Sequence, residues 1–167
     1  PSAARTPTLH RTCHLRVPPL PRSATGGEAG VDAGARVYRV RPDGSDIKTV
    51  VTCEYPNGLA FSPDEKTLYI ANTRTTQYIH AVEIDVEGNM SARRIFADLS
   101  GKEAGIPDGM KVDQSGHVFC TGPGGIWVHK PNGTHIGIIR LPEMAVNFAF
   151  GGPDLRTLFV CAVTSVY

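Results

Sequence analysis

Short apolar runs alternate with turn segments through most of the chain, and this pattern predicts a protein built of β-strands. Residues 56–72 show it well: they begin with Pro-Asn-Gly, continue with the apolar run Leu-Ala-Phe, and pass through Ser-Pro-Asp to Thr-Leu-Tyr-Ile-Ala-Asn. Proline presets φ and Asn-Gly accepts positive φ, as turns require. The two apolar runs are rich in strand-forming residues. We therefore expect a turn, a strand, a tight turn and a second strand.

The same order recurs twice downstream. Residues 107–112 read Pro-Asp-Gly-Met-Lys-Val and lead through Asp-Gln-Ser-Gly to an apolar run at 117–120. Residues 147–150 read Asn-Phe-Ala-Phe and lead through Gly-Gly-Pro-Asp to a further run at 157–160. The recurrence indicates an internal structural repeat.

The repeat has a period of about 40 to 50 residues, because similar alternating strands open at Val37, Ile79 and Ile126. Four strands per such period are typical of β-propeller blades, whereas the alternative, a β-sandwich, requires no internal similarity. Closed propellers have about 4 to 8 blades, so three would be half of a six-bladed ring with two open faces, through which copies could self-associate. We predict an all-β protein, a partial β-propeller of three four-stranded blades at residues 36–77, 78–122 and 123–167.

Residues 1–35 differ from the rest of the chain. They contain five prolines and four arginines, and no acidic residue precedes Glu28. The segment has neither strand alternation nor a helical stripe, and it lacks the apolar core of a secretory signal. We expect a poorly ordered, low-complexity leader that does not belong to the fold.

The overall charge and the cysteines limit the classes of partner. The formal net charge is +1, which predicts no nucleic-acid or membrane partner, and no apolar run approaches the roughly 18 residues of a membrane span. Cys120 and Cys161 lie in apolar strand patterns. We expect both to be buried free thiols, which favours a reducing, cytoplasmic location, although a bridge between them stays open.

Four phrases of the sequence are distinctive when taken together and in order. They are Pro-Asn-Gly-Leu-Ala-Phe-Ser-Pro-Asp at 56–64, Pro-Asp-Gly-Met-Lys-Val-Asp at 107–113, Thr-Gly-Pro-Gly-Gly-Ile-Trp-Val at 121–128 and Asn-Phe-Ala-Phe-Gly-Gly at 147–152. The set resembles the family of senescence-marker protein (regucalcin), gluconolactonase and luciferin-regenerating enzyme. The resemblance covers about residues 36–167 and implies a six-bladed propeller with a divalent metal, calcium or zinc, in its central channel, and hydrolysis of a small-molecule lactone or ester.

The resemblance also assigns site residues. It implies that Asn57 and Asp108 are metal ligands, and that Asn147 lies beside the substrate channel, although Asn147 falls one residue later in its repeat. The family's Glu-Gly-Pro ligand motif has no match, since residues 26–30 read Gly-Gly-Glu-Ala-Gly, and a further asparagine ligand from an earlier blade is also unmatched. The chain therefore resembles the C-terminal half of such a protein.

The repeat gives the assignment a geometric reason. Equivalent positions of adjacent blades lie around one axis, so Asn57 and Asp108 are expected to converge there. An amide oxygen and a carboxylate suit a hard cation such as calcium, which takes about 6 to 8 oxygens, so two ligands predict weak binding. A bound metal would polarise a lactone carbonyl or activate water, and Asp108 could act as general base. The plainer alternative is that Asn57-Gly58 and Asp108-Gly109 are only turns.

Other residue types predict no separate chemistry. The histidines lack paired metal-binding spacing, so surface or strand packing is expected. Trp127 lies in an alternating strand, where core packing is the usual role. Two functions therefore remain: a metal-dependent sugar-lactone hydrolase, or a non-catalytic propeller fragment that acts as a binding module. Lactone turnover by the chain would distinguish them.

Overall fold

The structure, a computed structural model, describes residues 34–74 and 76–167, and within those ranges it contains β-strands and no helix. The expected leader, residues 1–35, lies outside the described residues except for its last two. No helix in the described part is long and apolar enough to cross a membrane. The strands are β1 Ala35–Arg39, β2 Lys48–Cys53, β3 Pro56–Phe61, β4 Thr67–Asn72, β5 Tyr78–Ile84, β6 Met90–Asp98, β7 Met110–Val112, β8 Val118–Gly122, β9 Gly125–His129, β10 His135–Arg140, β11 Ala145–Gly151 and β12 Thr157–Ala162.

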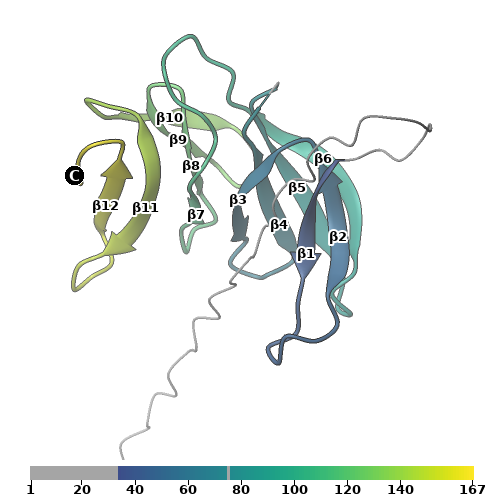
Figure 1. Ribbon diagram of the computed structural model, residues 1–167. Helices are drawn as coiled ribbons and strands as arrows, with labels where there is room; N and C mark the ends of the chain where they lie inside the picture. The colour runs from purple at the N-terminus through teal and green to yellow at the C-terminus, as the bar shows by residue number, and fades with distance from the viewer. Residues whose placement is uncertain (1–33, 75) are drawn as a thin grey trace, which may run out of the picture. The chain divides into compact units, whose positions relative to one another are not determined.

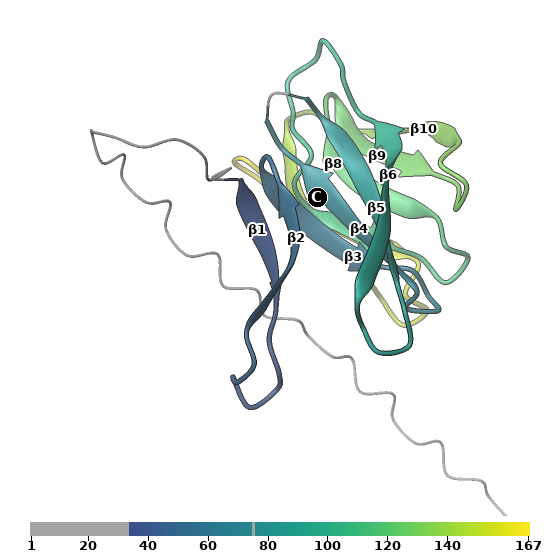
Figure 2. The same ribbon diagram turned by 90° about the vertical axis from the view of Figure 1, so that its right-hand side faces the viewer.

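The strands form successive antiparallel sheets, and each hydrogen-bonded pair joins strands that are adjacent in sequence. Strands β3 to β6 form one four-stranded sheet, and β7 to β10 form the next (Figure 1). Strands β1 and β2 form a two-stranded sheet, as do β11 and β12. Figure 2 shows β3, β4, β5 and β6 side by side in that order. The all-β class and the predicted strand positions are confirmed.

The predicted grouping into blades at 36–77, 78–122 and 123–167 is wrong, because each four-stranded sheet begins two strands later than predicted. Asn72 pairs with Tyr78 across the proposed boundary at residue 77, so β4 and β5 share a sheet. Only two residues, Glu54 and Tyr55, separate β2 from β3, yet these strands belong to different sheets. Spacing reveals the period of a repeat, but it does not show which short connection is a hairpin and which one crosses between sheets.

Six of the hairpin turns share one device, an Asp or Asn side chain that accepts a hydrogen bond from the backbone N–H two residues later. Such turns are compact and leave the strand register defined. The aspartate at the start of the β7–β8 turn, Asp113, also accepts from the backbone N–H of His117 at 2.8 Å. The turn residues are Asp43, Asp64, Asp85, Asp113, Asn132 and Asp154.

Apolar side chains fill the layers between successive sheets. Ile79 and Leu99 belong to the cluster between the β3–β6 and β7–β10 sheets, together with Met110 and Val118. Phe148 of β11 packs with residues of the β7–β10 sheet in the next cluster. Strand β4 is buried on both faces, since Leu68, Tyr69, Ile70, Ala71 and Asn72 are all inaccessible or nearly so. A central sheet buried on both sides is what consecutive propeller blades produce.

Candidate functional site

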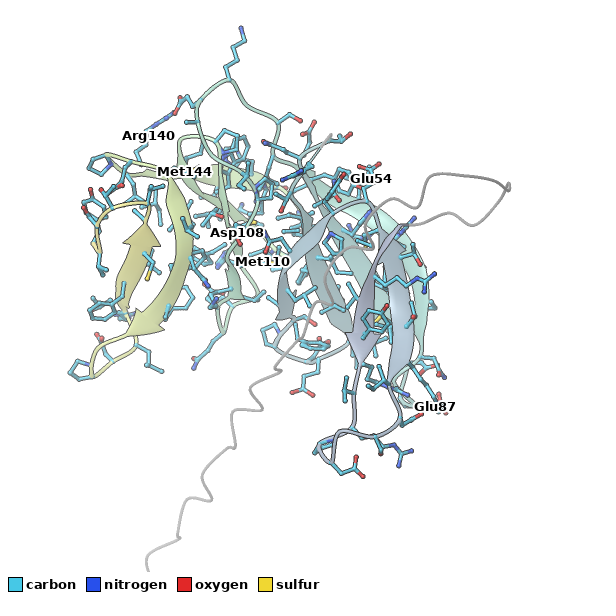
Figure 3. The ribbon with its side chains drawn as sticks, viewed as in Figure 1. Glu54, Glu87, Asp108, Met110, Arg140 and Met144 are labelled. Atoms are coloured by element: carbon cyan, nitrogen blue, oxygen red, sulfur yellow. The ribbon has the colours of Figure 1, made fainter. Side chains whose placement is uncertain are left out.

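Asn57 and Asp108 are brought together by a close approach of two backbones. Asn57 is the second residue of β3, and Asp108, labelled in Figure 3, lies two residues before the start of β7. A Cβ atom placed on Gly58 would lie 1.9 Å from the backbone oxygen of Asp108, so only glycine fits at this position. Gly58 thus does more than complete a turn. It lets the start of β3 contact the segment that carries Asp108.

The carboxyl group of Asp108 is partly buried beside the Asn57 side chain. Burial raises the pKa of Asp108 above its ordinary value, and the side chain of Asn57 acts in the opposite direction by lowering it. The backbone N–H of Asp108 donates to Thr121 Oγ1 at 2.9 Å, and that hydroxyl donates to the backbone oxygen of Ile106 at 3.1 Å. Thr121 is fully buried and therefore holds the Asp108 backbone in place.

Asn147 occupies a different position from the other two predicted residues. The backbone oxygen that faces Gly109 is that of Val146, at 2.9 Å from the Gly109 nitrogen, so Asn147 lies one residue beyond the counterpart of Asp108. Its Oδ1 accepts from the backbone N–H of Phe148 at 2.9 Å and from Lys111 Nζ at 3.3 Å. This oxygen already faces two donors, and it is a weaker candidate for a cation.

Bulges set the direction of two of these side chains. The pairing of β3 with β4 shifts between Pro56 and Leu59, and the pairing of β11 with β12 shifts between Ala145 and Asn147. A bulge bends a strand and redirects the side chain at the extra residue. Asn57 and Asn147 therefore leave the regular alternation of their strands, and both side chains are exposed.

The donor set suits an oxygen-loving cation better than zinc. Within the described ranges, no group of three or more His, Cys, Asp or Glu side chains could hold a metal ion. Asn57 and Asp108 instead offer an amide oxygen and a carboxylate side by side. The partly buried carboxylate would be stabilised by a positive charge, because burial disfavours its ionised form. These two residues fit a calcium-type ligand set, of which they supply a part.

The remaining sequence expectations have mixed outcomes. Cys120 is buried as predicted, but Cys161 is exposed, because its side chain lies on the uncovered face of β12. Both thiols are free, so the bridge left open by the sequence is not formed. Trp127 packs against the main core cluster, and His129 is buried within β9, so the predicted packing roles are confirmed.

Sequence reasoning missed a hollow that adjoins this site. It has a volume of about 510 Å³ and opens between the β4–β5 loop and the start of the β6–β7 connection. The Thr73 hydroxyl, on its wall, donates at 2.7 Å to the backbone oxygen of Pro107, the residue before Asp108. No sequence motif marks it, since its walls come from three separate segments. The lining residues are Tyr55, Thr73, Arg74, Gln77, Ser100 and Gly101.

Comparison with known proteins gives a consistent result. Residues 22–164 match the family model described as the SMP-30/gluconolactonase/LRE-like region, so the match begins inside the segment that we set apart as a leader. A gluconolactonase from Zymomonas mobilis is 34% identical over 137 residues, which cover 78% of this chain and 38% of that protein.

Solved structures agree in fold. A gluconolactonase from Xanthomonas campestris superimposes with a TM-score of 0.70 at 35% identity, covering 86% of this chain and 47% of that one. A regucalcin from Agrobacterium tumefaciens, described as a calcium-binding protein, gives a TM-score of 0.66 at 27% identity, covering 76% of this chain and 44% of that one. This chain therefore spans less than half the length of each of these relatives.

Proposed function

Because the chain belongs to the SMP-30/gluconolactonase/LRE-like family, we propose that it acts in the metal-dependent hydrolysis of sugar lactones, with Asn57 and Asp108 as ligands of a divalent cation. The observation that supports the proposal is the close approach of Gly58, the neighbour of Asn57, to the backbone oxygen of Asp108. The relatives named gluconolactonase support the substrate class. The calcium-binding relative and the oxygen donors favour calcium over zinc.

In this proposal Asp108 acts as the general base. A bound cation would polarise the lactone carbonyl and lower the pKa of a bound water. The Asp108 carboxylate takes a proton from the attacking water, whose oxygen bonds to the carbonyl carbon. The ring C–O bond then breaks, and the ring oxygen receives the proton and leaves as a hydroxyl. Burial raises the pKa of Asp108 in the metal-free site, and a bound cation would lower it and hold the carboxylate ionised.

The first experiment measures acid release from glucono-1,5-lactone by the purified chain, with calcium, zinc or a chelator. We expect metal-dependent turnover that falls by at least about 100-fold in Asp108→Asn, since the general base and the negative charge on the cation are lost together. Asp154→Asn, which changes an exposed acid in the β11–β12 turn, should leave turnover unchanged. Calorimetry tests the ligand assignment separately with Asp108→Ala, which removes both side-chain oxygens: unchanged calcium affinity in this variant would contradict it.

A second function follows from the number of ligands. Asn57 and Asp108 supply two of the roughly 6 to 8 oxygens that calcium takes, so the cation needs further ligands from water, substrate or other protein groups. A folded chain that binds calcium through Asp108 but turns over no lactone would favour a non-catalytic binding module.

A further inference from the structure

The hollow beside Asp108 carries one positive charge and no negative one. Arg74 is its single charged lining residue, and in the described part of the chain no carboxylate forms an ion pair with it. Glu54, the neighbour of Tyr55 in the sequence, accepts a hydrogen bond from Asn72 at 3.3 Å and is not part of the lining. Asp98 accepts from the backbone N–H of Ser100 at 2.7 Å. Arg74 is exposed, so its guanidinium is solvated and can pair with an anion that enters the hollow.

The other walls suit a sugar. The Arg74 guanidinium carbon lies 5.3 Å from the centroid of the Tyr55 ring and over one of its faces, and the Tyr55 side chain is still 39% exposed. Aromatic rings offer an apolar face to the C–H groups of a sugar, and Thr73, Gln77 and Ser100 add hydroxyl and amide groups. Gln77 Oε1 is buried and has no hydrogen-bond partner, although its Nε2 donates to the Gly105 oxygen at 3.4 Å.

A buried asparagine fixes the geometry of these walls. Asn72 is 0% exposed, and its Oδ1 accepts from the backbone N–H of Tyr55 at 2.8 Å. Its Nδ2 lies 2.9 Å from the Arg74 oxygen and 2.7 Å from the Thr76 oxygen. One side chain therefore ties Tyr55 to the backbone around Arg74. A binding wall held in this way loses little conformational entropy when a ligand arrives.

From these observations we propose that the hollow is a subsite for an anionic substituent on the sugar lactone, a carboxylate, phosphate or sulfonate, held by the Arg74 guanidinium while Tyr55 packs against the sugar. This inference rests on the proposed function and adds the substrate class. The hollow lies next to the candidate metal ligands, because Tyr55 is two residues from Asn57 and Thr73 contacts the residue before Asp108. Guanidinium groups pair with such anions through two parallel hydrogen bonds.

The binding test needs no catalysis. Glucitol 6-phosphate and glucitol share a polyol chain and differ in charge, and neither can be hydrolysed as a lactone. Trp127, the one tryptophan of the sequence, has its Cζ2 atom 3.8 Å from the Cβ position of Gly101 on the hollow's wall, so its fluorescence can report occupancy. We expect the wild type to bind the phosphate at least about tenfold more tightly than glucitol. Arg74→Gln should abolish this preference, and Arg74→Lys should retain part of it.

A matched control and a kinetic measurement complete the experiment. Arg156→Gln removes an exposed arginine in the β11–β12 turn and should keep the preference. With glucaro-1,4-lactone, an acidic substrate, Arg74→Gln should raise KM about tenfold, whereas KM for neutral glucono-1,5-lactone should not change. An equal effect on the two ligands, or no preference in the wild type, would overturn the subsite. Absence of all lactone turnover would count against the proposed function alone, because the binding measurement stands without it.

Discussion

At the scale of single residues, glycine does most to bring the candidate ligands together. Gly58 lets β3 approach the Asp108 backbone, and Gly109 approaches Asn147 so closely that a Cβ would lie 2.6 Å from its Oδ1. Gly58 lies within β3 and contacts the segment that leads into β7, and Gly109 precedes β7 and contacts β11. The Asn-Gly and Asp-Gly pairs are therefore contacts between sheets as well as turn sequences.

Gly58→Ala is expected to destabilise the protein by about 2 kcal/mol, because its Cβ overlaps backbone atoms that cannot rotate away. Calcium affinity should fall as well, since Asn57 moves with its neighbour. Gly137→Ala is the matched control, because nothing lies within 4 Å of its Cβ position. Urea unfolding of both variants measures the difference, and equal midpoints would contradict the close approach.

The candidate site could be predicted only in part at this scale. Asn57 and Asp108 could be predicted from the sequence because the same turn sequence recurs before two apolar runs. Asn147 could be predicted in the same way. Its Oδ1, however, accepts a hydrogen bond from Lys111 of the neighbouring sheet, and the sequence does not reveal this contact. Arg74 and Tyr55 carry no motif, and their pairing depends on how Asn72 folds the β4–β5 loop.

At the scale of elements, burial on both faces distinguishes the central strands from the outer ones. Successive residues of β4 point to opposite faces of the sheet, and each lies opposite a residue of β5: Ile70 pairs with His80, and Tyr69 pairs with Ala81. Both sets are buried. By contrast, β6 is the last strand of its sheet and exposes Ile95 to 62%. The sequence predicted the positions of these strands well. It did not predict which strands were central, because the spacing of the repeat does not show at which strand each sheet begins.

Ile70→Ala should therefore cost about 3 kcal/mol of unfolding free energy, since the side chain is 0% exposed and its removal leaves a cavity. Ile95→Ala deletes the same atoms from an exposed position and should cost less than about 0.5 kcal/mol. Chemical denaturation compares the two directly. Similar losses would mean that β4 is not the buried strand.

At the scale of the whole molecule, titrating groups of opposite type determine how stability depends on pH. Burial, with a smaller contribution from the charge of His135, lowers the pKa of His129 to about 4, and burial also lowers that of His80. Hydrogen bonds lower the pKa of turn carboxyls such as those of Asp43 and Asp85 below 3.8. The two histidines therefore change the stability of the fold at higher pH than the turn carboxyls do.

We expect stability to fall as the pH drops from about 6.5 to 4, because the unfolded chain binds a proton at residue 129 in this window and the folded chain does not. The loss attributable to His129 is at most about 3 kcal/mol. His129→Phe should flatten the dependence without removing it, since His80 acts in the same direction. Unfolding free energies at pH 7, 6, 5 and 4.5 measure this, and an unchanged slope in the variant would contradict it.

The pairing of sequence neighbours has a consequence for how the molecule folds. Among residues 34–74 and 76–167, each sheet is one continuous stretch of chain, so the strands that pair are neighbours in the sequence. Folding rates rise as contacts become more local, and hairpins close in microseconds. During synthesis the β3–β6 sheet can form once residue 98 has emerged, before β7 exists. The slow step is then the docking of finished sheets, which is also the step that brings Asn57 to Asp108.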